Sequence, residues 1–271
     1  MIMEKSEIVR ALHVAVFGTE PGPDTLETFV DEVGDNPLAL AELASRLYRF
    51  AEHVRTTGRH TMPDHSQNGE LRILLREMMT IGKRHGLIVD VGVLGRAGSN
   101  SYDLLTSFGW RGVLIEANPA LMAVIERDFG PADFALIECA IGPVSGRQVF
   151  HLGPGDAVSS LIETQATGWG TSRGEIEVDV RRLHDVLDEA HTPHDFDILD
   201  LDIEGMDVAV MNDLIENSAY RPRLVVIEAS YFFSTKSLDE VGLSAKVCSV
   251  YQILDKTASN LILGLIPGTA S

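Results

Sequence analysis

The feature that most constrains the fold is a series of seven short apolar runs after residue 85. Segments with helical periodicity separate the first five runs, which is the pattern of β-α-β units. Strands that are apolar throughout are typical of a parallel sheet covered on both faces. Only the four residues KTAS separate the last two runs, so we predict that these two strands pair antiparallel. The runs are GLIVDVG, GVLIEAN, FALIECAIG, FDILDLDI, RLVVIEAS, VYQILD and NLILGLI.

A different pattern precedes this region. Apolar residues recur at helical spacing over residues 5–55, and segments rich in Gly, Pro, Asp and Asn interrupt them. We predict three short helices, which form an all-α module over residues 1–58 before an α/β domain over residues 59–271, with residues 56–69 as the linker. Residues 13–50 resemble a small helical module found beside many unrelated bacterial domains. That resemblance implies docking or substrate presentation, and a helical cap that only packs on the main domain is the alternative.

Composition and charge argue against several classes of protein. The chain has 271 residues, 45% of them hydrophobic, which is enough to bury a core. The formal net charge of −18 would repel a phosphate backbone, so we expect no nucleic-acid partner. No run approaches the roughly 18 consecutive apolar residues that a membrane span needs. The first residues lack a signal-peptide pattern, so we expect a cytoplasmic protein. Cys139 and Cys248 lie in no disulfide or zinc spacing.

The ends of the first two predicted strands carry residues suited to a cofactor. In an open parallel sheet, ligands bind outside the carboxyl ends of the strands. Asp90 and Gly92 end the first strand without the G-x-G-x-x-G spacing of a dinucleotide site. Glu116 ends the second strand, where a carboxylate can accept both hydroxyls of a ribose. Asp90 would repel a diphosphate but tolerates a cation, so the pattern favours S-adenosylmethionine, with NAD as the alternative.

The densest group of acidic residues follows the fourth predicted strand. If that strand stays extended to its tip, its period of two places Asp200, Asp202 and Glu204 on one side. Buried like charges raise one another's pKa, which is typical of functional sites. Asp202 and Glu204 are therefore candidates for a general base or for ligands of Mg²⁺ or Ca²⁺, and Glu228 would complete a metal site with Asp202. Asp207 is interpreted as the acidic residue that favours a helix N-terminus.

Several separated motifs, in order, resemble the FkbM family of S-adenosylmethionine-dependent methyltransferases. The resemblance spans residues 66–265, and it implies a class I, Rossmann-like fold with a seven-stranded sheet that is parallel except for a terminal antiparallel hairpin. It also implies O-methylation of a hydroxyl on a small-molecule, sugar or carrier-bound acceptor, including natural products; association into a homo-oligomer stays open. The motifs are SQNGE (66–70), VDVG (89–92), SNSY (99–102), GWRGVLIEANP (109–119) and DLDIEGMD (200–207).

The motifs and the strand ends together give the candidate site. Val93 and Leu94 stand where the family usually has Ala and Asn, and the glycine loop is one residue shorter. This departure motivates a second alternative, a non-catalytic binding or scaffold protein. Ser159 and Ser160 resemble part of a family loop near the acceptor, and Trp169 is a candidate lid aromatic. The candidate cofactor-binding residues are Gln67, Glu70, Asp90, Gly92, Ser99, Asn100, Glu116, Ala117, Cys139, Ala140 and Asp202.

Overall fold

The computed structural model describes residues 4–17, 20–34, 37–57, 64–228 and 237–269 and divides into two compact units. The first unit comprises residues 1–64 and 71–84, and the second comprises residues 65–70 and 85–271. The predicted domain boundary between residues 58 and 59, and part of the predicted linker, lie outside the described residues. Among the described residues, no helix is both long and apolar enough to cross a membrane.

The first unit contains the three predicted helices, α1 (Lys5–Phe17), α2 (Pro23–Val33) and α3 (Pro37–Thr57), together with most of α4 (Glu70–Thr80). A proline stands at the first position of α2 and of α3, where a missing N–H costs nothing. The side chain of Arg49 is buried, and its Nη1 donates to the Arg72 carbonyl oxygen at 2.8 Å, which connects α3 to α4. The shared core of α1–α3 contains Val9, Val33, Leu43 and Leu47.

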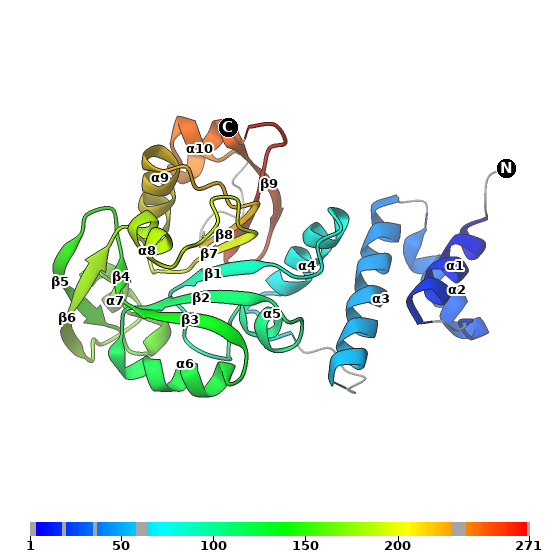
Figure 1. The fold of residues 1–271 in the computed structure, drawn as a ribbon, viewed down its shortest axis with the longest axis horizontal. Coiled ribbons are helices and arrows are strands. Elements are labelled where there is room, and N and C mark those ends of the chain that lie inside the picture. Colours follow the sequence, from blue (N-terminus) through cyan, green and yellow to red (C-terminus); the bar gives the residue numbers. More distant parts are fainter. Residues whose placement is uncertain (1–3, 18–19, 35–36, 58–63, 229–236, 270–271) are drawn as a thin grey trace. The chain divides into compact units, whose positions relative to one another are not determined.

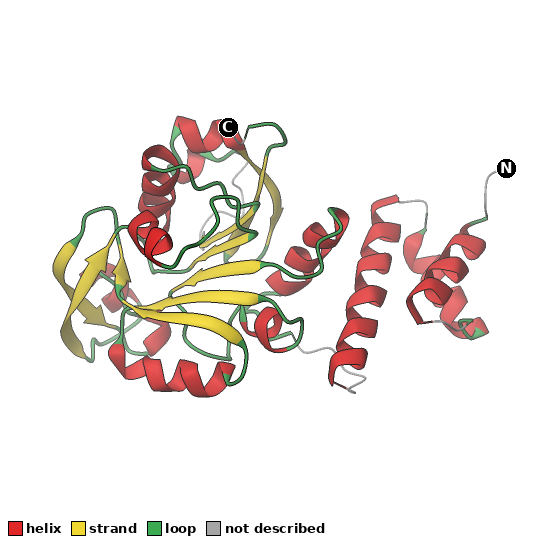
Figure 2. Ribbon diagram, in the orientation of Figure 1, coloured by secondary structure: helices red, strands yellow, loops and turns green. Residues whose placement is uncertain are grey.

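The second unit is built on a seven-stranded sheet with the order β3-β2-β1-β7-β8-β10-β9 (Figures 1 and 2). The first five strands in this order run parallel, and β10 pairs antiparallel with both β8 and β9. All seven predicted strands and the terminal antiparallel pair are therefore present. The strands are β1 (Leu87–Val91), β2 (Arg111–Glu116), β3 (Asp133–Glu138), β7 (Ile198–Leu201), β8 (Leu224–Glu228), β9 (Tyr251–Lys256) and β10 (Asn260–Leu265).

Helices cover both faces of this sheet. In Figure 1, α5 and α6 lie on one side of β2 and β3, and α8 and α9 lie on the other. Every residue of β1 and β7 is buried, as expected for strands covered on both faces. The helices are α5 (Tyr102–Thr106), α6 (Met122–Phe129), α7 (Glu163–Gly168), α8 (Leu183–Glu189), α9 (Asp207–Asn217) and α10 (Ala245–Val250), with short 3₁₀ turns η1 (Pro119–Leu121), η2 (Asp156–Val158) and η3 (Asp239–Val241).

A second, three-stranded sheet has the order β4-β6-β5, and the sequence did not predict β5 or β6. Only one face of this small sheet is buried, around Phe150, Val178 and Val180. Its outer face is exposed and polar, so neither strand forms a continuous apolar run. The small sheet places β5 and the turn after it beside the carboxyl end of β2, where they help to form a pocket. Its strands are β4 (Ala140–Ile141), β5 (Gly146–Leu152) and β6 (Gly174–Arg181).

Candidate active site

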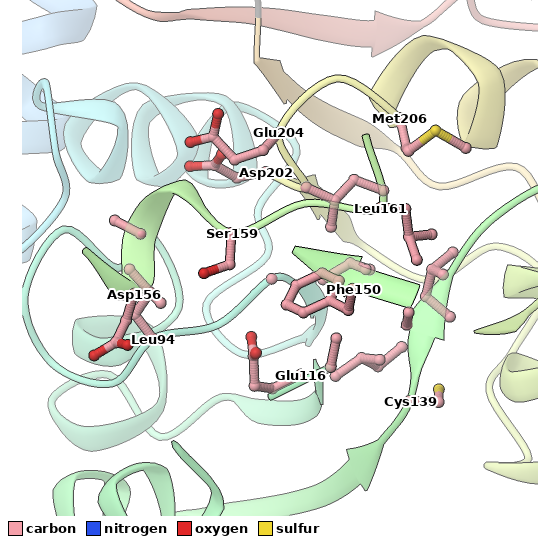
Figure 3. Close-up of a pocket in the computed structure, with 18 residues that line it drawn as sticks. Leu94, Glu116, Cys139, Phe150, Asp156, Ser159, Leu161, Asp202, Glu204 and Met206 are labelled. Atoms are coloured by element: carbon pink, nitrogen blue, oxygen red, sulfur yellow. The ribbon is translucent and has the colours of Figure 1, made fainter. Parts of the chain in front are cut away.

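A pocket with about 500 Å³ of open space lies at the carboxyl ends of β1, β2 and β7 (Figure 3). This is the edge of a parallel sheet at which ligands bind, and the strand order reverses between β1 and β7. None of the described residues that form its wall is Lys, Arg or His. The wall consists of Val91, Gly92, Leu94, Ile115, Glu116, Ala117, Cys139, Ala140, Ile141, Phe150, Asp156, Ala157, Ser159, Leu161, Asp202, Ile203, Glu204 and Met206.

Gly92 brings two parts of the wall into backbone contact. Its φ is +95°, a conformation that side chains rarely allow. A Cβ atom here would overlap the carbonyl oxygen of Asp202 and lie 3.0 Å from the carbonyl carbon. The N–H of Gly92 donates to the Ile115 carbonyl oxygen at 2.9 Å. Only glycine fits at this position, because the backbone after β1 passes directly against the backbone after β7.

Glu116 contributes a carboxyl group to the wall from the tip of β2 (Figure 3). Its Oε1 accepts a hydrogen bond from the Asn118 N–H at 2.6 Å, which fixes the side chain. Burial raises the pKa of Glu116 to about 8, although the backbone N–H donors of Asn118 and Ala117 oppose this shift. Additional donors, such as the two hydroxyls of a ribose, would favour the ionised form. The carboxyl group is thus suited to a neutral ligand with hydroxyl groups.

Asp90 lies behind the wall instead of in it. Its side chain is 4% exposed, and its Oδ2 accepts a hydrogen bond from the Ser101 hydroxyl. Asp90 is the register partner of Asp200 on β7, whose Oδ1 accepts from Asn100 Nδ2 at 3.3 Å. Burial raises the pKa of Asp90 to about 6 and raises that of Asp200 well above its ordinary value. Ser99 is also buried in this polar group, since its Oγ lies 3.1 Å from Ser101 Oγ.

The segment that contains Gln67 and Glu70 also lies outside the pocket wall. Glu70 is fully buried and accepts hydrogen bonds from Thr257 Oγ1 at 2.6 Å and Asn260 Nδ2 at 2.9 Å. Burial acts to raise the pKa of Glu70, but these hydrogen bonds and that from the Asn68 N–H outweigh burial and lower it. Glu70 therefore joins the segment before α4 to β10. Gln67 is exposed.

The strand that precedes Asp202 ends earlier than predicted. β7 stops at Leu201, and the chain then turns because Glu204 and Gly205 have φ values of +52° and +99°. The prediction that an extended strand aligns Asp200, Asp202 and Glu204 is therefore wrong. Asp200 is buried within β7, while Asp202 and Glu204 are half-buried and line the pocket.

The turn nevertheless gathers three carboxyl groups. One oxygen from each of Asp202, Glu204 and Glu228 lies within 4.8 Å of the other two. Burial, followed by the charge of Glu228, raises the pKa of Asp202 well above its ordinary value and that of Glu204 to about 7. Three clustered carboxylates can hold a hard cation such as Mg²⁺ or Ca²⁺, or one of them can accept a proton. Glu228 lies at the end of β8 and outside the pocket wall.

Asp207 has the structural role that the sequence suggested. It is the first residue of α9, and its carboxylate accepts from the N–H groups of Ile203 at 3.2 Å and Gly205 at 3.1 Å. Burial raises the pKa of Asp207 to about 7. These bonds hold the turn that carries Glu204, and Ser160 adds a hydrogen bond to the Glu204 carbonyl oxygen at 2.8 Å.

The opposite end of the pocket is apolar. Cys139 is 3% exposed, and burial raises the pKa of its thiol to about 11, so the thiol is neutral. Ala140 follows it in the wall, and Phe150 lies on the adjoining small sheet. Sequence reasoning missed Phe150, because one aromatic residue in a polar strand carries no distinct signal. Trp169 is 62% exposed and does not line the pocket.

The comparison with protein families agrees with this architecture. The Methyltransferase FkbM domain matches residues 82–243, which cover more than half of the chain and most of the strands that form the pocket. The chain therefore belongs to the FkbM methyltransferase family. No curated protein matches it.

The buried carboxyl groups predict how stability depends on pH. Glu116 and Asp90 have native pKa values of about 8 and about 6, above the ordinary 4.5 and 3.8. The native state therefore keeps protons that the unfolded chain has released, and the free energy of unfolding should fall as pH rises from about 4 to about 8. Urea unfolding across this range measures the slope. The unfolding is measured in about 0.5 M salt, which screens surface charges more than buried ones. Under these conditions Glu116→Gln should flatten the slope near pH 7. A slope unchanged in that variant would contradict the assignment.

Proposed function

We propose that this protein is an S-adenosylmethionine-dependent O-methyltransferase that methylates a hydroxyl of a small-molecule, sugar or carrier-bound natural-product acceptor. The observation that carries the proposal is the pocket itself. It combines a hydroxyl-binding carboxyl group at Glu116, an apolar end at Cys139 and Phe150, and a cluster of carboxyl groups at Asp202 and Glu204. Membership in the FkbM family supports methyl transfer as the reaction class.

The residues of the pocket fit this cofactor. Glu116 would accept the ribose hydroxyls, and the apolar wall at Cys139, Ala140 and Phe150 would contact the adenine. The absence of basic side chains among the described wall residues disfavours a dinucleotide, whose diphosphate would face Glu116 and Asp156. When bound, S-adenosylmethionine supplies an electrophilic methyl group on a cationic sulfur. Asp90, Ser99 and Asn100 would act from behind the wall, where side-chain hydrogen bonds join them to Ser101 and Asp200.

The acceptor hydroxyl must lose its proton during methyl transfer. Asp202 is the candidate base, because a carboxylate whose pKa is raised holds a proton more strongly than an ordinary one. The alternative is that Asp202, Glu204 and Glu228 together hold Mg²⁺ or Ca²⁺, which would acidify the hydroxyl. In both cases the walls of the pocket would hold the acceptor oxygen close to the methyl group, and such alignment can supply several kcal/mol.

Ligand binding tests the cofactor directly. We expect S-adenosylmethionine and S-adenosylhomocysteine to raise the melting temperature of the protein and NAD to leave it unchanged. A ligand at about 100 times its Kd stabilises the native state by about 2.7 kcal/mol, which a thermal shift detects easily. Stabilisation by NAD alone would favour an oxidoreductase. No shift with any of the three ligands would favour a non-catalytic binding protein.

Removal of divalent cations separates the two accounts of Asp202. If the three carboxylates hold a cation, EDTA should abolish methyl transfer, leave the affinity for S-adenosylhomocysteine nearly unchanged, and permit recovery on addition of Mg²⁺ or Ca²⁺. If Asp202 acts as a base without a metal, EDTA should have no effect. Calorimetry on the same samples checks the affinity. Loss of cofactor binding on chelation would contradict both accounts, because Glu116 and the apolar wall do not need a cation.

A further inference from the structure

His65 connects α5 to the loop that follows β1, and Leu94 of this loop lines the proposed cofactor pocket. Its Nδ1 lies 2.9 Å from Asp103 Oδ1, and its backbone N–H donates to Asp103 Oδ2 at 2.7 Å. On the other side of the ring, Arg96 Nε donates to His65 Nε2 at 2.9 Å. Asp103 is 1% exposed and lies in α5, while Arg96 lies in the loop after β1. The imidazole therefore bridges a buried carboxylate and an exposed guanidinium.

The chemistry of the two partners determines the state of the ring. A guanidinium only donates hydrogen bonds, so His65 Nε2 must present its lone pair to Arg96. The ring proton of a neutral imidazole then lies on Nδ1, from which it donates to the Asp103 carboxylate. Asp103 thereby orients the ring so that Nε2 faces Arg96. His65 acts on Arg96 as a fixed acceptor.

Other contacts hold Arg96 at the same place. Its backbone N–H donates to Asp128 Oδ2 at 3.2 Å, and its guanidinium lies 5.6 Å from the centre of the Tyr102 ring. Two residues earlier in the same loop, Leu94 lines the pocket. The loop therefore has one side chain in the pocket wall and another anchored outside it. A backbone bridge between Ser66 and Gly98 joins the same loop to the residue that follows His65.

We infer that His65 is a positioning residue for cofactor binding, and that it keeps Leu94 and Gly92 in the pocket wall by fixing Arg96. This inference rests on the proposed function, because it assumes that the pocket binds S-adenosylmethionine. The loop presents the apolar side chain of Leu94 to the pocket, and Arg96 anchors the loop outside the pocket.

Two substitutions of His65 separate its two contacts. Asn carries an amide near the position of Nδ1, so His65→Asn keeps a donor for Asp103 but removes the acceptor for Arg96. The longer Gln side chain can bring its carbonyl oxygen near the position of Nε2, so His65→Gln keeps the acceptor for Arg96. Arg96→Ala and the double variant with His65→Asn complete a double-mutant cycle. His194→Asn is the matched control, since His194 packs on Tyr220 away from the pocket.

Calorimetry with S-adenosylhomocysteine and hydrogen exchange over residues 92–101 are the two measurements. We expect His65→Asn and Arg96→Ala each to raise the Kd by about 3- to 10-fold and to speed exchange in this loop. The double variant should be no worse than either single variant. His65→Gln should stay within about 2-fold of the unchanged protein, as should His194→Asn.

Two results would overturn the inference. One is equal loss in His65→Asn and His65→Gln, which would indicate a merely structural residue. The other is a double variant whose losses add, which would mean that His65 does not act through Arg96. If the unchanged protein fails to bind S-adenosylhomocysteine, the proposed function fails. Hydrogen exchange then still tests whether His65 fixes the loop, because that measurement needs no ligand.

Discussion

Asp202→Asn should lower kcat by ~10² to 10⁴ and leave the Kd for S-adenosylhomocysteine nearly unchanged. The carboxyl group of Asp202 lines the pocket beside Glu204, and its pKa is raised by burial and by Glu228. An amide has almost the same shape, but it cannot accept the proton of the acceptor hydroxyl and binds a cation weakly. The substitution also removes a half-buried carboxyl group from a crowded acidic site, so we expect no loss of folding stability.

Steady-state methyl transfer, followed as release of S-adenosylhomocysteine, measures this effect. Asp179→Asn is the matched control. It replaces the same carboxylate by the same amide, but Asp179 is exposed on β6 and lies outside the pocket wall. If Asp202 is a base, the variant should also lose the acidic limb of the pH profile. Full activity of both Asp202→Asn and Glu204→Gln in the presence of EDTA would mean that neither carboxyl group performs chemistry and that transfer relies on alignment alone.

Gly92→Ala should be the most destabilising single-methyl change in the pocket, with a loss of about 3 to 5 kcal/mol. A positive φ contributes about 1 to 2 kcal/mol of this loss. The rest comes from overlap of the new Cβ with the carbonyl group of Asp202, which is backbone and cannot rotate away. The chain after β1 or after β7 must then move, and both segments line the pocket. We therefore expect the same variant to lose cofactor binding.

Gly98→Ala separates these two causes. Gly98 also has a positive φ, of +74°, but no atom lies within 4 Å of the position that a Cβ would occupy. This control should lose only about 1 to 2 kcal/mol in urea unfolding. Equal losses in the two variants would show that the contact with Asp202 has no energetic weight.

The large sheet could be predicted from the sequence, and the small sheet could not. β1 and β7 are buried on both faces, so each forms a continuous apolar run that is visible without any partner. β5 and β6 bury only one face, and their exposed positions carry polar and charged residues. Their buried residues become a strand signal only once the two strands pair. Phe150 was missed for this reason, although it lines the pocket, and Asp156 was missed because it lies in the short turn η2 that follows β5.

The candidate site was predicted in part, and backbone geometry explains the difference. Glu116 and Asp202 line the pocket, as expected from their places at strand ends. Asp90 precedes Val91, the first residue of β1 that lines the pocket, and its side chain is buried behind the wall. Glu204 joins Asp202 through a turn with positive φ, which strand periodicity does not represent. The contact of His65 with Arg96 spans 31 residues and belongs to no motif, so no pattern in the sequence indicated it.

Calorimetric titration of S-adenosylhomocysteine into the unchanged protein and into Glu116→Ala tests the central claim most directly. Glu116 is the carboxyl group at the tip of β2 that we assign to the ribose hydroxyls. We predict that the unchanged protein binds one molecule per chain and that Glu116→Ala weakens binding by about 1 to 3 kcal/mol, the cost of leaving those hydroxyls unpaired. Equal affinity in the two proteins, or no binding by the unchanged protein, would contradict the account.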